Sequence, residues 1–301
     1  MRVVTLLPAA TEIVAALGGA EYLVGISHEC DYPPSVQWLP RVTATPVDSR
    51  MSGAAIDADV RRLSASGKPV IGIDAGQLQA LRPDLIITQG LCDVCAVSDG
   101  QVYRLAGSMA SAPEVLSLVG RNLDGIWSDI YAVGAALELG DEAEELVLGL
   151  ESRLQRLRSQ RHGARARVAC IEWLDPLYVA GHWVPELVEA AGGEDVGARP
   201  GSHSFRREWR DLHRLEPDCL IVMLCGFGVE RIRRELSTLE DPEGLELMSR
   251  VPTWIIDGNS FTSRAGPRVV DGARLIHSAI GDQPWAGKIE KWAPPVQSSL
   301  S

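Results

Sequence analysis

The strongest constraint on the fold is an internal repeat that relates the two halves of the chain. It shows in two pairs of segments: Thr11–Ala20 with Pro185–Glu194, and Leu81–Asp84 with Leu215–Asp218. The second pair shares a Leu-x-Pro-Asp pattern, and in both halves it leads into an apolar run that reads as a strand. Similar segments in the same order predict two similar lobes.

Short β-rich runs alternate with helical segments in both halves, which is typical of the α/β class. In the first half the expected strands are Val3–Leu7, Leu23–Ile26, Val70–Ile73, Leu85–Thr88 and Val115–Leu118. In the second half they are Val168–Trp173, Leu220–Leu224 and Trp254–Asp257, with helices expected at Val184–Ala191, Trp209–Leu215 and Gly266–Ile280. The sequence therefore predicts two Rossmann-like α/β lobes.

A helical segment separates the halves. An apolar stripe from Leu123 to Leu137 ends at Gly140, and a second stripe runs from Asp141 to about Gln160. The second helix would be about 30 Å long, enough to join two lobes as a backbone helix. We expect an N-terminal lobe at 1–121, the helical segment at 122–163, a C-terminal lobe at 164–283 and an extended tail at 284–301, with a ligand cleft between the lobes.

Composition excludes several classes of function. The 301 residues carry 29 Lys and Arg against 40 Asp and Glu, a net charge of −11 that disfavours nucleic acid as a partner. The longest apolar stretches, such as Cys219–Cys225, are too short to span a membrane. The segment from Met1 shows no export signal, so we expect a cytoplasmic protein, or a periplasmic one if a signal precedes this sequence. In a cytoplasm the six cysteines would be reduced.

The unusual residues follow the expected strands, where open α/β sheets bind ligands. We expect a ligand site formed by His28, Cys30, Asp31, Tyr32, Gln89, Cys92, Asp93, Cys95, Trp173, His182, Trp183, Cys225, Phe227, Phe261 and Arg264. The aromatic members suit a large planar ligand. Arg264 and Arg268 can hold a carboxylate or amide of the ligand, or pair with Asp257 or Asp271.

The cysteines allow a second interpretation. Cys92-x-x-Cys95 has metal-ligand spacing, and Cys30 is expected at the same edge, so the three thiolates suit zinc or an iron–sulfur cluster. His28, His182 or Cys225 would be a fourth ligand. The alternative is a set of reduced structural or reactive thiols. No nucleotide, esterase or metalloprotease motif is present, so no catalytic residue is assigned.

Several motifs resemble one known group of proteins. They are Leu6–Val14, His28–Pro33, Leu81–Gln89, Gly181–Glu186 and Asp257–Asn259. They look like the cobalamin-binding branch of the helical-backbone metal-receptor superfamily, the class III periplasmic-binding-protein-like group, over roughly residues 2–282. The resemblance implies two α/β lobes on one long helix and an aromatic-lined cleft. It also implies an importer contact through Glu12 and Glu186, the acidic positions that the repeat pairs. His28-Glu-Cys30 with Cys92-x-x-Cys95 looks characteristic of a cytoplasmic offshoot of that group.

Three hypotheses follow. The leading one is a binding protein that holds a corrinoid such as cobalamin, or a related metal-bearing ligand, with His28, His182 or a cysteine as axial ligand. The second is a metalloprotein or enzyme with zinc or an iron–sulfur cluster on Cys30, Cys92 and Cys95, whose acid–base groups would be Glu29, Asp31, Asp93 or Glu172. The third is the substrate-binding component of an ABC importer for cobalamin or a metal chelate.

Overall fold

The computed structural model describes residues 1–90, 97, 99–160, 164–283 and 288–293. The chain folds into two compact α/β units, as the repeat predicts. Unit 1 comprises Met1–Met51, Ala55–Leu150 and Ala265–Pro267. Unit 2 comprises Ser52–Ala54, Glu151–Arg264 and Arg268–Ser301.

Unit 1 is built on a parallel four-stranded sheet in the order β2-β1-β5-β6. These strands span Leu23–Gly25, Val3–Thr5, Leu85–Gln89 and Glu114–Leu118. The central strands β1 and β5 are buried almost throughout, which explains their continuous apolar sequence. A separate antiparallel pair joins β3 (Thr43–Ala44) to β4 (Gly72–Ile73).

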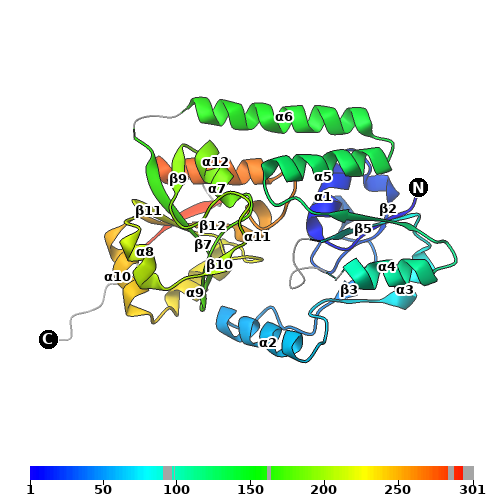
Figure 1. Ribbon diagram of the computed structural model, residues 1–301, viewed down its shortest axis with the longest axis horizontal. Helices are drawn as coiled ribbons and strands as arrows, with labels where there is room; N and C mark the ends of the chain where they lie inside the picture. The colour runs from blue at the N-terminus through cyan, green and yellow to red at the C-terminus, as the bar shows by residue number, and fades with distance from the viewer. Residues whose placement is uncertain (91–96, 98, 161–163, 284–287, 294–301) are drawn as a thin grey trace. The chain divides into compact units, whose positions relative to one another are not determined.

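The helices of unit 1 are α1 (Pro8–Ala16), α2 (Gly53–Ala65, whose first two residues belong to unit 2), α3 (Ala75–Leu81), α4 (Asp99–Ser108) and α5 (Leu123–Ala136), with 3₁₀ turns at Ala20–Tyr22 and Pro34–Val36. Helices α1 and α5 pack together on one face of the sheet, and α3 and α4 lie on the other (Figure 1). Asn122 begins α5 by accepting a 2.8 Å hydrogen bond from the Gly125 N–H. The helix α6 (Gly140–Ser159) follows, and the boundary between the units falls within it.

Unit 2 contains a mixed seven-stranded sheet in the order β10-β8-β7-β11-β12-β13, with β9 also paired to β7. The strands span β7 (Ala166–Leu174), β8 (Leu177–Val179), β9 (Gly193–Asp195), β10 (Phe205–Arg206), β11 (Cys219–Val222), β12 (Thr253–Ile256) and β13 (Ile289–Trp292). Strands β7, β9, β11 and β12 are parallel, whereas β8, β10 and β13 are antiparallel to their neighbours.

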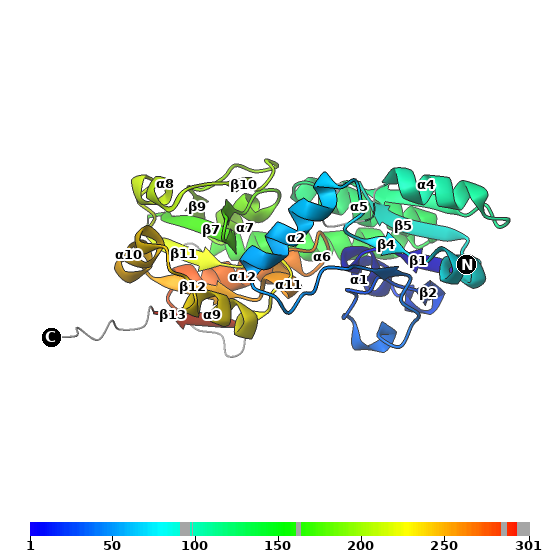
Figure 2. The same ribbon diagram turned by 90° about the horizontal axis from the view of Figure 1, so that it is seen from below.

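The helices of unit 2 are α7 (Val184–Ala190), α8 (Trp209–Arg214), α9 (Val229–Ser237), α10 (Pro242–Arg250), α11 (Gly258–Phe261) and α12 (Val269–Ile280). Helices α7 and α12 pack against each other on one face of the sheet, and α9 lies on the opposite face, against β12 and β13 (Figures 1 and 2). Asp241 and Asp257 begin α10 and α11 as N-caps.

The Leu-x-Pro-Asp repeat performs the same structural task in both units. Asp84 accepts a 2.7 Å hydrogen bond from the backbone N–H of Arg2, and Asp218 accepts one of the same length from that of Arg167. Both arginine side chains donate in return to backbone carbonyls of the turn before the aspartate. The repeat therefore fixes the start of the first strand of each unit.

The structure differs from the sequence prediction at two segments. Only Gly72–Ile73 of the expected strand at 70–73 is a strand, and it lies outside the main sheet, while Val70 and Ile71 pack in the core of unit 1. The expected extended tail contains β13, which pairs antiparallel with β12 and buries Ile289 and Trp292 (Figure 2). Four residues with two apolar side chains are too few to show a readable period.

Among the described residues, no helix combines the length and apolar character needed to cross a membrane.

Candidate functional site

In unit 1, the loop after β2 holds His28 in a network of hydroxyl groups. The Thr43 hydroxyl oxygen lies 2.7 Å from His28 Nδ1 and accepts a 2.9 Å hydrogen bond from the His28 backbone N–H. Burial lowers the pKa of His28, an effect that Glu29 opposes and Arg41 reinforces. His28 Nε2 is enclosed and has no hydrogen-bond partner in the described part of the chain.

Cys30 lies two residues further on and points into the interior of unit 1. The residue is 1% exposed, and its sulfur is 3.0 Å from the Thr11 hydroxyl, which is itself 2.6 Å from the hydroxyl of Thr5. Cys92, Asp93 and Cys95 lie outside the described residues. Within the described ranges, no group of three His, Cys, Asp or Glu side chains is placed to hold a metal ion. The three-cysteine metal site therefore stays a prediction.

The other predicted residues of unit 1 lie near the surface. Asp31 and Tyr32 are exposed, and Gln89 is half-buried at the carboxyl end of β5. The preceding residue of β5, Thr88, is fully buried, and its hydroxyl makes no hydrogen bond to any residue that the structure describes. Polar atoms that have no partner among the described residues thus lie near the carboxyl ends of two strands of unit 1.

In unit 2, Trp173 and Phe227 form an aromatic pair. Trp173 lies near the end of β7 and Phe227 follows β11, and their ring centroids are 5.3 Å apart at a tilt of 47°. The guanidinium of Arg231 lies 4.8 Å from the centre of the Phe227 ring. The Trp173 indole nitrogen is buried and lacks a hydrogen-bond partner among the described residues.

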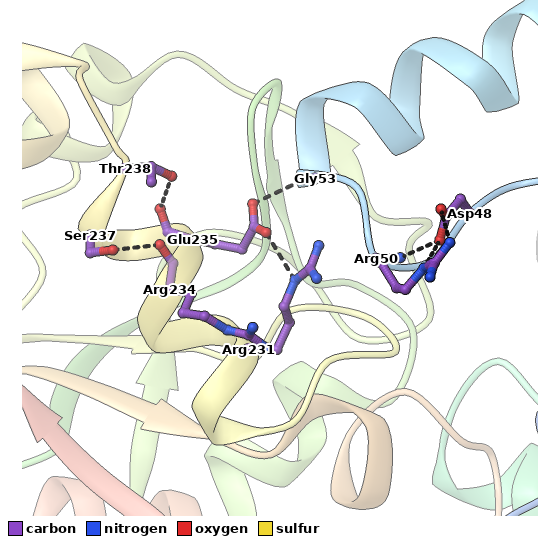
Figure 3. A network of polar contacts seen from close by, with 8 residues as sticks. All are labelled: Asp48, Arg50, Gly53, Arg231, Arg234, Glu235, Ser237 and Thr238. Carbon is purple, nitrogen blue, oxygen red and sulfur yellow. Dashed lines mark hydrogen bonds and ion pairs between the residues drawn. The ribbon is translucent and has the colours of Figure 1, made fainter.

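A carboxylate next to this pair organises the surrounding backbone. Glu235 accepts a 3.0 Å bond from Arg231 and a 2.9 Å bond from the backbone N–H of Gly53, at the start of α2 (Figure 3). A Cβ at Gly53 would lie 3.4 Å from the Trp173 ring, so this short segment packs directly on the indole. The environment of Trp173 therefore includes residues remote in sequence.

His182 and Cys225 occupy two further loops of unit 2. His182 has a left-handed φ of 54°, and its ring centroid lies 5.3 Å from that of the exposed His203. Its neighbour Gly181 packs on the backbone of Ser202–Ser204, where an added Cβ would approach to 2.3 Å. Cys225 is a half-buried free thiol whose backbone N–H donates to the Glu172 carbonyl oxygen.

Three other predicted site residues of unit 2 are buried. Trp183 is 5% exposed, and its indole N–H donates a 2.9 Å hydrogen bond to the Thr262 carbonyl oxygen. Arg264 donates to the Asn259 side-chain oxygen at 2.9 Å, and Phe261 is covered by the cations of Arg268 and Lys288. Asp271 was expected as a possible partner of Arg264 or Arg268. In the structure it forms an ion pair with Arg153.

The acidic pair expected to contact an importer differs in exposure. Glu12 is 3% exposed in α1, and Glu186 is half-buried in the first turn of α7. A carboxylate at 3% exposure offers little surface to an external arginine, so an importer contact at Glu12 would require a local rearrangement.

A hollow of about 390 Å³ lies at the other edge of the unit 1 sheet, lined by Met1, Tyr22, Asp84, Leu137 and Glu138. It contains none of the predicted site residues, and it adjoins the amino ends of β1 and β5. Ligands of open α/β sheets bind at the carboxyl ends, so the loops after the strands stay the candidate site.

Comparison with known proteins identifies the family. The family model described as periplasmic binding protein matches residues 3–254, most of the chain. The chain belongs to this family. This membership, together with the neighbouring structures, confirms the resemblance to the helical-backbone metal-receptor superfamily and the two-lobe α/β fold.

Several proteins that are similar to this chain are named for the ligands they bind. A vitamin B12-binding protein of Pectobacterium carotovorum is 23% identical over 285 residues, which cover 93% of this chain and 88% of that protein. A periplasmic heme binding protein of Pseudomonas aeruginosa shares the fold with a TM-score of 0.69 at 19% identity, over 98% of this chain and 95% of that one. The periplasmic vitamin B12 binding protein of Vibrio cholerae gives a TM-score of 0.63 at 20% identity, over 93% and 96%.

Several residues of the candidate site were not predicted from the sequence. Thr88 is a hydroxyl residue at the end of the apolar run Leu85–Ile87, which is the signal that would have identified it. Thr43 gives no such signal, because it stands among the polar and small residues of Arg41–Thr45. Arg231, Glu235 and Gly53 give no such signal, because each looks like an ordinary residue at the start or on the surface of a helix.

Proposed function

We propose that this protein binds a metal-bearing tetrapyrrole, a corrinoid in preference to haem, and that the Trp173–Phe227 pair of unit 2 contacts it. The vitamin B12 and heme binding named for its relatives supports this class of ligand. Membership of a solute-binding family supports binding rather than turnover as its role. The comparisons lend no support to an enzyme built on zinc or an iron–sulfur cluster.

The observation that carries the proposal is the indole N–H of Trp173. It is buried beside the Phe227 ring, with no acceptor in the described part of the chain. An unsatisfied buried donor costs about 1–3 kcal/mol, which a bound acceptor would recover. A tetrapyrrole offers both things that this pair needs: a flat apolar face for the rings, and amides or carboxylates at its rim for the N–H.

The net charge discriminates between the two tetrapyrroles. Haem carries two carboxylates, whereas the side chains around a corrinoid are mainly neutral amides. A chain with a net charge of −11 repels a dianion at long range and so slows its association. We therefore expect the affinity for haem to increase with ionic strength, and that for a neutral corrinoid to be almost independent of it.

The test is a titration of the purified protein with cyanocobalamin and, separately, haemin. We expect quenching of tryptophan fluorescence that saturates at one equivalent. Trp173→Phe should weaken binding roughly tenfold, because it keeps a ring but removes one hydrogen bond worth about 1–1.5 kcal/mol. Trp183→Phe is the matched control and should keep the wild-type affinity, because its N–H is already bonded to Thr262. Equal affinities of the wild type and Trp173→Phe would contradict the role of Trp173.

A further inference from the structure

The helix α6 has one buried face and one exposed face. Apolar side chains form the buried face, and they are Ala143, Val147, Leu150, Leu154 and Leu157. The opposite side, here called the outer face, carries Glu145, Leu148, Ser152 and Arg156, with Glu144 and Arg158 at its edges. All six residues are exposed, and Leu148 is 56% exposed. The described part of the chain therefore leaves the outer face uncovered.

The charges of α6 have opposite signs in its two halves. Before Leu148 the helix carries carboxylates and no cation: Asp141, Glu142, Glu144 and Glu145. After Ser152 it carries cations and no carboxylate: Arg153, Arg156 and Arg158. The helix dipole accounts for Asp141 and Glu142, which lie in the first turn. It does not account for Glu144 and Glu145, because its effect is lost beyond that turn.

The chain itself does not neutralise the charges of the outer face. Arg153, which lies beside that face, pairs with Asp271. Among the described residues, no ion pair involves the four charged members of the outer face, Glu144, Glu145, Arg156 and Arg158. Arg156 donates a 2.6 Å hydrogen bond to the Ser152 hydroxyl, which holds its guanidinium along the outer face. These four charges are therefore available to an external partner.

The spacing of these charges matches an antiparallel copy of the same helix. Glu145 and Arg156 are 11 residues apart, or about three helical turns, so they lie on the same side of α6. Glu144 and Arg158 are 14 residues apart, or about four turns. Both pairs are centred at residues 150–151, close to the middle of the helix. A two-fold axis at this point places each glutamate opposite the matching arginine of a second copy, and Leu148 beside its Ser152.

We propose that the outer face of α6 is the interface of a homodimer in which two α6 helices pack antiparallel. The partner is a second copy because the charge pattern is complementary to itself when the helix is reversed. The inference is independent of the ligand. One pair of helices buries less than the ~1,600 Å² of a standard interface, so we expect a weak dimer with a Kd of about 10–100 µM. The net charge of −11 on each chain opposes association at long range.

The test is sedimentation equilibrium of the full chain and of two charge-reversed variants. The first variant combines Glu144→Arg with Glu145→Arg, and the second combines Arg156→Glu with Arg158→Glu. Each variant alone places like charges opposite each other, so we expect its self-association to be at least about tenfold weaker than that of the wild type. A 1:1 mixture should associate as strongly as the wild type, because a basic helix then meets an acidic one. The two reversals cancel in the mixed pair, so its total charge equals that of two wild-type chains.

Further variants separate the interface from the fold. Arginine and glutamate are both good helix formers at exposed positions, and circular dichroism verifies that each reversed variant is folded. Should one of them fail to fold, Leu148→Lys tests the same face with a single change. It places two ammonium groups close to the two-fold axis, so we expect it to weaken the dimer at least about tenfold. Tyr103→Ala is the control, because Tyr103 is 51% exposed on α4 and should not alter self-association.

Three results would overturn the proposal. One is a wild-type chain that stays monomeric at concentrations on the order of 500 µM, well above the expected Kd. Another is association of both reversed variants as strong as that of the wild type, since a different surface would then form the dimer. The third is a mixture of the two variants that associates no better than either alone, because antiparallel pairing of α6 requires the opposite. None of these results affects the proposed binding of a tetrapyrrole.

Discussion

Trp183 and Thr262 are joined by a 2.9 Å hydrogen bond from the indole N–H to the backbone carbonyl oxygen. The bond links the residue before α7 to the residue after α11, 79 positions apart in the chain. Trp183 is 5% exposed, so its ring is buried inside unit 2 and its N–H is hydrogen-bonded there. Trp173 has the opposite character, with a buried N–H that no described residue accepts.

The two tryptophans should therefore respond differently to the same change. Trp183→Phe leaves the Thr262 carbonyl oxygen without its donor and reduces the buried ring, so we expect unfolding to require about 1–3 kcal/mol less free energy. Trp173→Phe should change stability little or raise it, because it removes an unsatisfied donor. Urea denaturation of both variants measures the difference. The reverse order of stabilities would contradict these assignments.

Asp195 should make the stability of the protein depend on pH. Its carboxylate accepts hydrogen bonds from the backbone N–H groups of Gly197 and Ala198 at 2.8 and 3.0 Å. Burial nevertheless raises the pKa of Asp195 to about 7. The two hydrogen bonds and the charge of Arg207 lower this pKa, but by less than burial raises it. The folded protein then retains a proton that the unfolded chain, with a pKa of 3.8, has already lost. The contribution of protonated Asp195 to the stability of the folded protein is therefore complete below about pH 4 and is lost as the pH rises through 7.

Asp195→Asn removes this dependence while it keeps a side-chain acceptor. The variant should match the wild type at pH 4 and be more stable by about 2–4 kcal/mol at pH 8. Urea unfolding at a series of pH values measures the difference. Parallel stability curves for the two proteins from pH 4 to 8 would show that Asp195 titrates normally.

Gly181 should tolerate no side chain. A Cβ there would lie 2.3 Å from the Ser202 carbonyl oxygen and 2.7 Å from the Ser204 nitrogen, and backbone atoms cannot move aside as a flexible side chain can. We expect Gly181→Ala to destabilise unit 2 by about 2 kcal/mol or more and to displace the loop that carries His203.

Gly149 gives the matched control. It lies within α6 with open space around its Cα, so Gly149→Ala should stabilise the protein by about 0.5–1 kcal/mol through helix propensity. Thermal unfolding of the two alanine variants should therefore shift in opposite directions. A shift in the same direction would contradict the close approach at Gly181.

Sequence periodicity predicted the elements that carry long apolar patterns. Helix α5 and the backbone helix α6 begin and end within about two residues of the expected positions, and the central strands β1, β5, β7, β11 and β12 are present. The repeat was informative because Asp84 and Asp218 make equivalent contacts: each accepts a hydrogen bond from the backbone N–H of an arginine at the first strand of its unit. Short antiparallel strands such as β10 and β13 could not be predicted, because two to four residues define no period.

The candidate site could be predicted by region and less well by residue. Loops after parallel strands could be located from the strands alone, and His28, Trp173 and Phe227 lie in them or directly beside them. What each side chain does there depends on partners remote in sequence: Thr43 for His28, Thr262 for Trp183, and Phe227 for Trp173. No local spacing encodes such contacts.

The central claim is that the protein binds a metal-bearing tetrapyrrole, and equilibrium dialysis of the purified protein against cyanocobalamin, aquacobinamide and haemin tests it most directly. We predict one equivalent of corrinoid bound per chain with a Kd of about 1 µM or tighter, and weaker binding of haemin that improves with added salt. The claim would be contradicted if the protein retained none of the three ligands at concentrations on the order of 100 µM. Such a result would mean that each binding free energy is weaker than about 5.5 kcal/mol.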